Sequence, residues 1–257
     1  MTARSVADAT NDSGDERYSR HILLTELGEA GQKKIRQAHA LVIGAGGLGS
    51  PACYYMASAG TGRITLVDDD RVELSNLQRQ ILHFTDRIGE NKAHSGARTI
   101  GQINPDVQVI PVTERLDAGL LESLIEDVTV VLDCTDNFAT RHIINRVCVA
   151  RRVPLVSGTA LRFDGQVSLF DLRRDDAPCY ACFYSADMEF VDRKAAQHGV
   201  FAPMIGAIGT IQAMEALKLI AGIGKSLSQR VLLFDALEVK WTEMYLERDP
   251  QCQVCAK

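Results

Sequence analysis

Two Cys-x-x-Cys pairs, Cys179/Cys182 and Cys252/Cys255, are the residues of this chain best suited to hold a metal ion. Four thiolates in two such pairs match the ligand set of tetrahedral Zn2+ and leave no coordination position open for chemistry. The sequence therefore predicts a structural zinc that ties two distant parts of the chain together. Two unrelated thiol or redox pairs are the alternative, but a redox pair needs a thioredoxin-like context that is missing here.

A glycine-rich turn, Gly44-x-Gly46-x-x-Gly49, follows the apolar run Ala40–Ile43 and opens a helical pattern. In that context glycines let backbone amides approach phosphates, and the helix N-terminus adds partial positive charge. Asp68 follows the next apolar run, about twenty residues after the turn, where an acid can hold ribose hydroxyls. These features predict a nucleotide site without deciding among NAD, FAD and ATP.

Polar and charged residues come next, where a dehydrogenase would continue its second crossover: Asn76, Arg79 and Lys92. Cations beside a glycine-rich turn suit a triphosphate, whose negative charge must be neutralised as it reacts. Asp136 follows another apolar run, at a strand end where open α/β sheets bind ligands, and its carboxylate could hold Mg2+ on phosphate oxygens. Each residue alone is more simply a solvated charge, but their convergence on one sheet edge favours a site.

The elements that must position these residues alternate between strand and helix, which is typical of a parallel sheet with right-handed crossovers. Strands are predicted over residues 40–43, 63–67, 107–112, 128–132 and 154–157, with helices over 49–59, 91–103, 118–126 and 139–150. Beyond them we expect a hairpin around an Asp164-Gly165 turn, a loop over 183–199, a helix over 202–220, and strands over 230–234 and 238–245. The predicted fold class is α/β: a Rossmann-like, mostly parallel sheet that continues into a mixed sheet with antiparallel C-terminal strands and a zinc clip.

Composition narrows the function classes. The 257 residues are 46% hydrophobic and carry a net charge of −5, which argues against nucleic acid or a membrane as a partner. No long apolar run and no apolar signal core are evident, so we expect a cytoplasmic protein. Residues 1–16 are predicted to be a disordered tail and 17–257 a single domain, with a nucleotide-binding part at 17–158 and a zinc-bearing part at 159–257. The cysteines outside the two pairs are expected to be packing thiols: Cys53, Cys134 and Cys148.

Seven ordered markers make residues 17–255 resemble the ThiF/MoeB/HesA family, bacterial relatives of ubiquitin-activating enzymes. Besides the glycine turn and the cysteine pairs, the markers are Arg17–Arg20, Ser75–Arg79, Asp133–Asp136, Pro154–Gly158 and Ala202–Gly206. Within the family the resemblance is strongest to the MoeB branch, which activates the small subunit of molybdopterin synthase.

The resemblance implies that ATP and Mg2+ are used to adenylate a small ubiquitin-fold sulfur-carrier protein with a Gly-Gly C-terminus, MoaD- or ThiS-like. The carrier's terminal carboxylate would attack the α-phosphate and release pyrophosphate. By position, Asp68 is expected to hold the ribose, Gly47 to approach the nucleotide, and Asp136 to hold magnesium. Phosphate contacts are expected from Asn76, Arg79 and Lys92. Arg20 resembles the family's arginine finger, which implies a homodimer, and residues 159–257 would dock the carrier.

One departure bears on the chemistry. Several relatives carry a reactive cysteine in the segment that corresponds to 187–199, which has none here. Adenylation alone is therefore expected, with sulfur delivered from elsewhere. An NAD-dependent oxidoreductase would share the glycine turn and Asp68, but it does not explain Arg79, Lys92 or the cysteine pairs. A non-catalytic, zinc-clipped scaffold for a ubiquitin-like tail is the third hypothesis. The sequence does not choose between the carriers of molybdopterin and thiamine synthesis.

Overall fold

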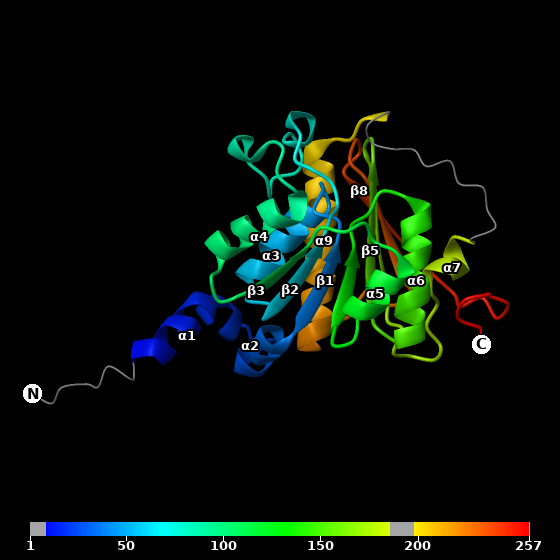
Figure 1. Ribbon diagram of the computed structural model, residues 1–257. Coiled ribbons are helices and arrows are strands. Elements are labelled where there is room, and N and C mark those ends of the chain that lie inside the picture. Colours follow the sequence, from blue (N-terminus) through cyan, green and yellow to red (C-terminus); the bar gives the residue numbers. More distant parts are fainter. Residues whose placement is uncertain (1–8, 186–197, 257) are drawn as a thin grey trace, which may run out of the picture.

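One eight-stranded sheet organises the protein, in the strand order β3-β2-β1-β4-β5-β6-β7-β8 (Figure 1). The computed structural model describes residues 9–185 and 198–256. Strands β1 to β5 pair in parallel, and β6, β7 and β8 continue the sheet antiparallel. Their bounds are β1 His39–Ile43, β2 Arg63–Val67, β3 Gln108–Val112, β4 Val130–Asp133, β5 Leu155–Leu161, β6 Asp164–Phe170, β7 Arg230–Asp235 and β8 Lys240–Tyr245. The predicted fold class is confirmed.

Helices cover both faces of the sheet, because the central strands are apolar on both sides. Along β1, Ala40 and Val42 join the core under α3 and α9, while Leu41 and Ile43 join the core under α5 and α6. This is the two-residue period of a strand buried on both faces. The helices are α1 Ala9–Ile22, α2 Gly28–Gln37, α3 Gly49–Ser58, α4 Lys92–Ile103, α5 Ala118–Leu124, α6 Phe138–Arg151, α7 Tyr180–Phe183 and α9 Ala202–Ala221, with short 3-10 turns η1 Leu74–Asn76 and η2 Thr85–Arg87.

Side chains that accept backbone N–H bonds start the crossover helices α4 and α6. Asn91 accepts from the amide of Ala93 at the start of α4, and Asn137 accepts from that of Thr140 at the start of α6. Such caps satisfy amides that have no partner inside the helix. They fix where these helices begin, and both begin directly beside the strand ends that carry the polar residues.

Helix α9 is the most apolar element. By length and composition it could cross a membrane, but 56% of its apolar window is buried inside the molecule. It packs against α3 so closely that a Cβ at Gly209 would lie 2.2 Å from the carbonyl oxygen of Leu48. The apolar composition of α9 is therefore that of a core helix.

The hairpin turn was predicted at the wrong residues. Strands β5 and β6 extend until Leu161 pairs with Asp164, so the two turn residues are Arg162 and Phe163, and Arg162 has a positive φ of 54°. Gly165 lies inside β6 for a different reason: a Cβ there would meet the side chain of Ile208 on α9 at 2.5 Å. The glycine thus permits close packing of α9 on the strand and does not form the turn.

The N-terminal prediction also needs correction. Residues 9–16, expected to be disordered, belong to α1, while residues 1–8 lie outside the described part of the chain. Tyr18 is buried, its hydroxyl accepts a 2.8 Å hydrogen bond from Asn104, and its ring lies where a Cβ of Gly60 would be. These long-range contacts anchor α1, and a local sequence pattern cannot show them. Most of the predicted 183–199 loop, residues 186–197, lies outside the described residues.

Candidate functional site

The strand order places the point where the winding of the sheet reverses at the carboxyl ends of β1 and β4. From β1 the chain winds outward to β2 and β3, whereas β4 and β5 lie on the other side of β1. Ligands of open α/β sheets bind where the winding direction reverses. The register makes the strand ends level, because Ile43 pairs with both Val67 and Asp133. The segments after these three strands are therefore neighbours, and they carry most of the predicted nucleotide-site residues.

Close backbone packing explains the glycines of the turn. Gly44 has φ of +99°, and a Cβ there would lie 2.7 Å from the Cys134 carbonyl oxygen, in the segment after β4. A Cβ at Gly49 would lie 1.9 Å from the carbonyl oxygen of Gly44. At Gly47 it would meet Ile205 of α9 at 2.5 Å and Arg79 at 3.5 Å. Glycine is therefore required at Gly44 and Gly49, whereas a Cβ at Gly46 would meet Gln80 only at an ordinary 3.6 Å, and the turn contacts the segment after β4, α9 and the segment that follows β2.

Asp68 holds the turn from the end of β2. Its Oδ2 accepts a 2.7 Å hydrogen bond from the amide of Ala45, and its Oδ1 accepts one of 2.9 Å from the amide of Asp70. Burial raises the pKa of Asp68, while the positive charge of Lys92 acts in the opposite direction. A carboxylate so placed fixes the backbone of the turn, and its remaining lone pairs can accept from ribose hydroxyls.

Lys92 opens α4 beneath this edge. Its side chain is only 7% exposed, and its Nζ lies 2.9 Å from Oδ2 of Asp70, whose side chain is 70% exposed. A buried ammonium must be paired, because burial disfavours its charge. Since its partner is an exposed surface carboxylate and not a buried one, an incoming phosphate could take that place.

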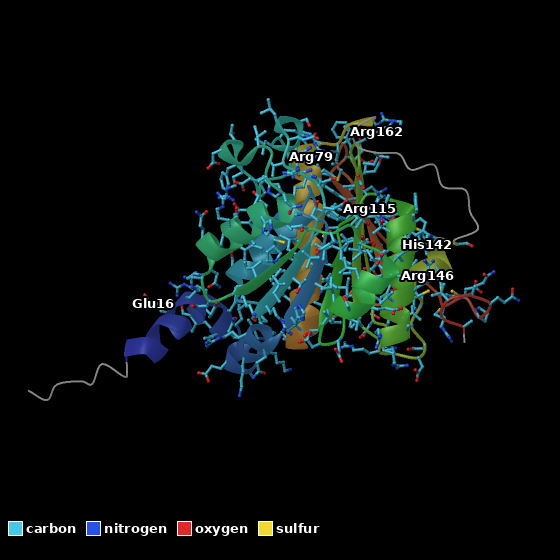
Figure 2. The ribbon with its side chains drawn as sticks, viewed as in Figure 1. Glu16, Arg79, Arg115, His142, Arg146 and Arg162 are labelled. Carbon is cyan, nitrogen blue, oxygen red and sulfur yellow. The ribbon has the colours of Figure 1, made fainter. Side chains whose placement is uncertain are left out.

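Arg79 and Asn76 lie half-buried in the segment between β2 and α4, and Arg79 lies at the upper end of the molecule in Figure 2. Arg79 donates to the Ser75 carbonyl oxygen at 3.2 Å, and the Asn76 side chain accepts from the amide of Glu73 at 3.3 Å. Both side chains therefore brace η1. The guanidinium has five N–H groups, so most of its fork is open to an anion.

Asp136 is exposed, three residues past the end of β4, and among the described residues it has no hydrogen bond or ion pair. A carboxylate with open lone pairs at this edge fits an oxygen-ligated cation such as Mg2+. The structure does not bring Arg20 to the same place. Its helix, α1, packs where α3 and α4 end, at Gly60 and Asn104, on the opposite side from the glycine turn.

The sequence did not reveal several buried polar residues that support the site. His83 donates from Nε2 to the Ala45 carbonyl oxygen at 2.9 Å and accepts at Nδ1 from Ser95 at 3.0 Å, and burial lowers its pKa. Gln212 of α9 donates to the Asp133 carbonyl oxygen at 2.8 Å. Gln80, 5% exposed, has an Oε1 without a partner in the described structure. Such residues stand out only because a polar side chain is surrounded by apolar ones in the folded protein. A single sequence does not show which side chains surround it.

The four paired cysteines meet beside α6, where α7 and the C-terminal segment lie together (Figure 1). Their sulfur atoms all lie within 4.8 Å of one another, with separations of 3.7 Å for Cys179–Cys252, 3.4 Å for Cys182–Cys255 and 4.0 Å for Cys179–Cys182. Zn–S bonds of about 2.3 Å in a tetrahedron require sulfur separations of about 3.8 Å. A disulfide would need about 2.05 Å. The arrangement therefore fits a four-thiolate zinc site, as predicted, and Asn145 donates to the Cys179 sulfur at 3.5 Å.

The remaining thiols are unsuited to chemistry. Burial raises the pKa of Cys53 to about 12 and also raises the pKa values of Cys134 and Cys148. All three are buried, and a thiol is a nucleophile only as its thiolate. Their predicted role as packing residues agrees with this environment.

Comparison with known proteins decides the family. The ThiF family model matches residues 18–254. The chain belongs to the ThiF family. Among its ThiF-family relatives, the molybdopterin-synthase adenylyltransferase of Escherichia coli is 44% identical over 241 residues, which cover 94% of this chain and 96% of the relative. The sulfur carrier protein ThiS adenylyltransferase of Escherichia coli is 41% identical over 95% of this chain and 96% of its own length.

Solved structures share the fold of this ThiF-family chain. A crystal structure of Escherichia coli MccB with ATP aligns with a TM-score of 0.82 at 24% identity, covering 93% of this chain and 73% of that one. At this identity the similarity concerns the fold alone. The expected resemblance to the family is thus confirmed, whereas the roles of individual residues stay predictions.

Proposed function

We propose that the protein is an adenylyltransferase that uses ATP to activate the C-terminal glycine carboxylate of a small ubiquitin-like sulfur-carrier protein. One observation carries the proposal: the glycine turn, the Lys92 and Arg79 cations and the Asp136 carboxylate converge at the switch point of the sheet. The names of the relatives support it, because they are adenylyltransferases for molybdopterin synthase and for the carrier ThiS. An NAD-dependent oxidoreductase and a non-catalytic scaffold are not favoured.

Each residue of the site has a proposed role in binding ATP or in stabilising the charge of the reacting phosphates. Asp68 binds the ribose, and the backbone of the turn around Gly47 lies against the phosphates. Arg79, Lys92 and Asn76 bind phosphate oxygens and stabilise the negative charge that grows as the carboxylate adds; a single such electrostatic contact contributes about 3–4 kcal/mol. Asp136 holds Mg2+, which when bound neutralises charge on the leaving pyrophosphate. Positioning two anionic reactants side by side is the other large contribution.

The zinc-bearing part, residues 159–257, is proposed to dock the carrier. Strand β8 is the edge of the sheet, and every residue in it is exposed. Large apolar side chains gather there and on the turn before it: Leu237, Val239, Trp241, Met244 and Tyr245. An exposed apolar edge of this kind favours a protein partner over solvent. The carrier is MoaD- or ThiS-like, which places the enzyme in molybdopterin or thiamine synthesis, in the cytoplasm.

A homodimer is proposed to complete the site. Arg20 is exposed at the end of α1 and has no hydrogen bond or ion pair within the described part of its own chain. Beside it, an apolar cavity of about 220 Å³ is lined by residues that include Leu24, Met214 and Leu217. An apolar surface next to an unpaired cation supports association that carries Arg20 into a second subunit's site.

Pyrophosphate exchange with purified carriers tests the proposal. With ATP, Mg2+ and either a MoaD-like or a ThiS-like carrier, we expect label to pass from pyrophosphate into ATP, and intact mass to show AMP on the carrier. The carrier that accepts AMP identifies the pathway. Exchange without any carrier, or none with both carriers, would refute the function. Stabilisation of the fold by NAD and not by ATP would support the oxidoreductase.

A further inference from the structure

Arg141 is a buried charge beneath the segment that carries Asp136. Its side chain is 6% exposed, and its Nε lies 4.0 Å from Oδ2 of Asp133, which is 1% exposed. Burial by itself lowers the pKa of Arg141, but the charge of Asp133, together with Tyr180 and Tyr184, more than offsets this, so the guanidinium stays protonated. Asp133 also accepts from the Ser157 hydroxyl at 2.8 Å and from the amide of Thr135 at 3.0 Å.

The fork of Arg141 joins this segment to β5. One terminal nitrogen donates to the Thr135 carbonyl oxygen at 2.6 Å and to the Gly158 carbonyl oxygen at 2.9 Å. The other donates to the hydroxyl of Thr159. The Thr135 carbonyl belongs to the peptide group that links Thr135 to Asp136. The hydrogen bond therefore sets the orientation of the backbone on which Asp136 stands.

We propose that Arg141 is a positioning residue that holds the Asp136 carboxylate in place for Mg2+·ATP. Asp136 has no side-chain hydrogen bond or ion pair with the described residues, so its direction depends on the backbone behind it. An ion placed by a carboxylate tolerates displacements of a few tenths of an ångström only. Arginine is required because its acceptors are bonded by two separate nitrogens of a rigid planar fork, whereas the three N–H donors of a lysine radiate from a single nitrogen and cannot span both segments. The inference rests on the proposed role of Asp136 but not on the identity of the carrier.

The test uses ATP and Mg2+ without a carrier, so that it stands apart from the adenylation assay. The melting temperature is measured at fixed ATP while MgCl2 is varied, for the wild type, Arg141→Lys and a matched control, Arg63→Lys. Arg63 also pairs with an aspartate, Asp127, but at the amino ends of the parallel strands, away from Asp136. Both variants are expected to melt earlier than the wild type when ATP is absent.

Only Arg141→Lys is expected to need more Mg2+ for half of the ATP-induced stabilisation, by about tenfold, which corresponds to about 1.4 kcal/mol. An unchanged Mg2+ midpoint in Arg141→Lys, together with a lowered melting temperature, would show that Arg141 only stabilises the fold and would overturn the proposal. If Arg141→Lys does not fold, the Thr159→Val variant tests the proposed positioning role of Arg141 instead. It keeps the shape of the side chain and removes one Arg141 acceptor, so we expect the Mg2+ midpoint to rise about two- to threefold, and no rise would overturn the proposal.

A wild-type protein that shows Mg2+-dependent stabilisation by ATP but never adenylates a carrier would refute the proposed function and leave this inference testable. A wild type whose ATP response does not depend on Mg2+ would refute the inference itself.

Discussion

Among single residues, Asp136 is the one whose replacement should reduce activity with the least effect on stability. It is exposed and makes no hydrogen bond or ion pair with the described residues, so its removal should change the free energy of unfolding by less than about 0.5 kcal/mol. We expect Asp136→Ala to reduce carrier-dependent pyrophosphate exchange by at least about 100-fold, because one charge contact to the reacting phosphates is lost. Exchange rate and melting temperature are measured together.

The matched control is Asp86→Ala, which removes another exposed carboxylate, in η2. It should keep wild-type exchange. If Asp136→Ala exchanged nearly as fast as the wild type, the proposed magnesium role would be wrong.

The sequence predicts residues well where the local pattern alone determines the role. Gly44 and Gly49 were identified because a turn between a strand and a helix requires them, and the cysteine pairs because their spacing is specific to metal sites. Arg141 and His83 were missed because their roles depend on carbonyl groups that are distant in the chain, at Gly158 and Ala45. A single sequence contains no record of those contacts.

At the scale of elements, the parallel crossovers were predictable, helices α2 and α7 were not predicted, and two further exceptions have one cause. Apolar strands and capped helices carry local signals, so β1 to β5 and α3 to α6 lie close to their predicted places. The misplaced turn at Gly165 and the missed helix α1 both depend on packing against remote elements, α9 in one case and the ends of α3 and α4 in the other. A glycine indicates a turn, and a polar N-terminal segment indicates disorder, only when neither packs against a remote element.

The glycine turn as an element should make stability depend on pH. His83 supports the turn in its neutral form, and burial lowers its pKa below the value of about 6.5 of an unfolded chain. Between those two pKa values the unfolded chain binds more protons, so the free energy of unfolding rises with pH and is lost as the pH falls below about 6.5. Replacing His83 by glutamine keeps a donor and an acceptor but removes the titration.

We therefore expect His83→Gln to lose less stability than the wild type between about pH 7.5 and about pH 5.5, by roughly 1 kcal/mol in denaturant unfolding. His94→Gln, on the exposed face of α4, is the control and should lose as much as the wild type. His39 and His142 also have lowered pKa values through burial, so part of the loss should persist in every variant. Equal losses in His83→Gln and the wild type would contradict this account.

For the whole molecule, helix α6 connects the zinc centre to the nucleotide edge. Arg141 and Asn145 lie one turn apart on it, and Asn145 accepts from the amide of Tyr180 at 3.0 Å while donating to the Cys179 sulfur. His142, on the same helix (Figure 2), meets the Tyr180 ring edge-on at 5.4 Å. One buried face of α6 thus bonds the metal-bearing turn through Asn145 and the segment before Asp136 through Arg141.

Zinc removal should consequently change both the stability of the fold and the response to Mg2+. We expect zinc-depleted protein, freed of chelator by gel filtration, to melt about 10 °C lower, since each lost kcal/mol shifts the melting temperature of a domain of this size by about 2–4 °C. The Mg2+ concentration for half of the ATP-induced stabilisation should rise as well, because α6 loses its support at Asn145, and added zinc should restore both values. Cys148→Ala changes a thiol of α6 outside the metal cluster and should keep its zinc and its Mg2+ midpoint. A depleted protein that melts earlier with an unchanged midpoint would show that the zinc centre stabilises the fold without supporting the segment before Asp136.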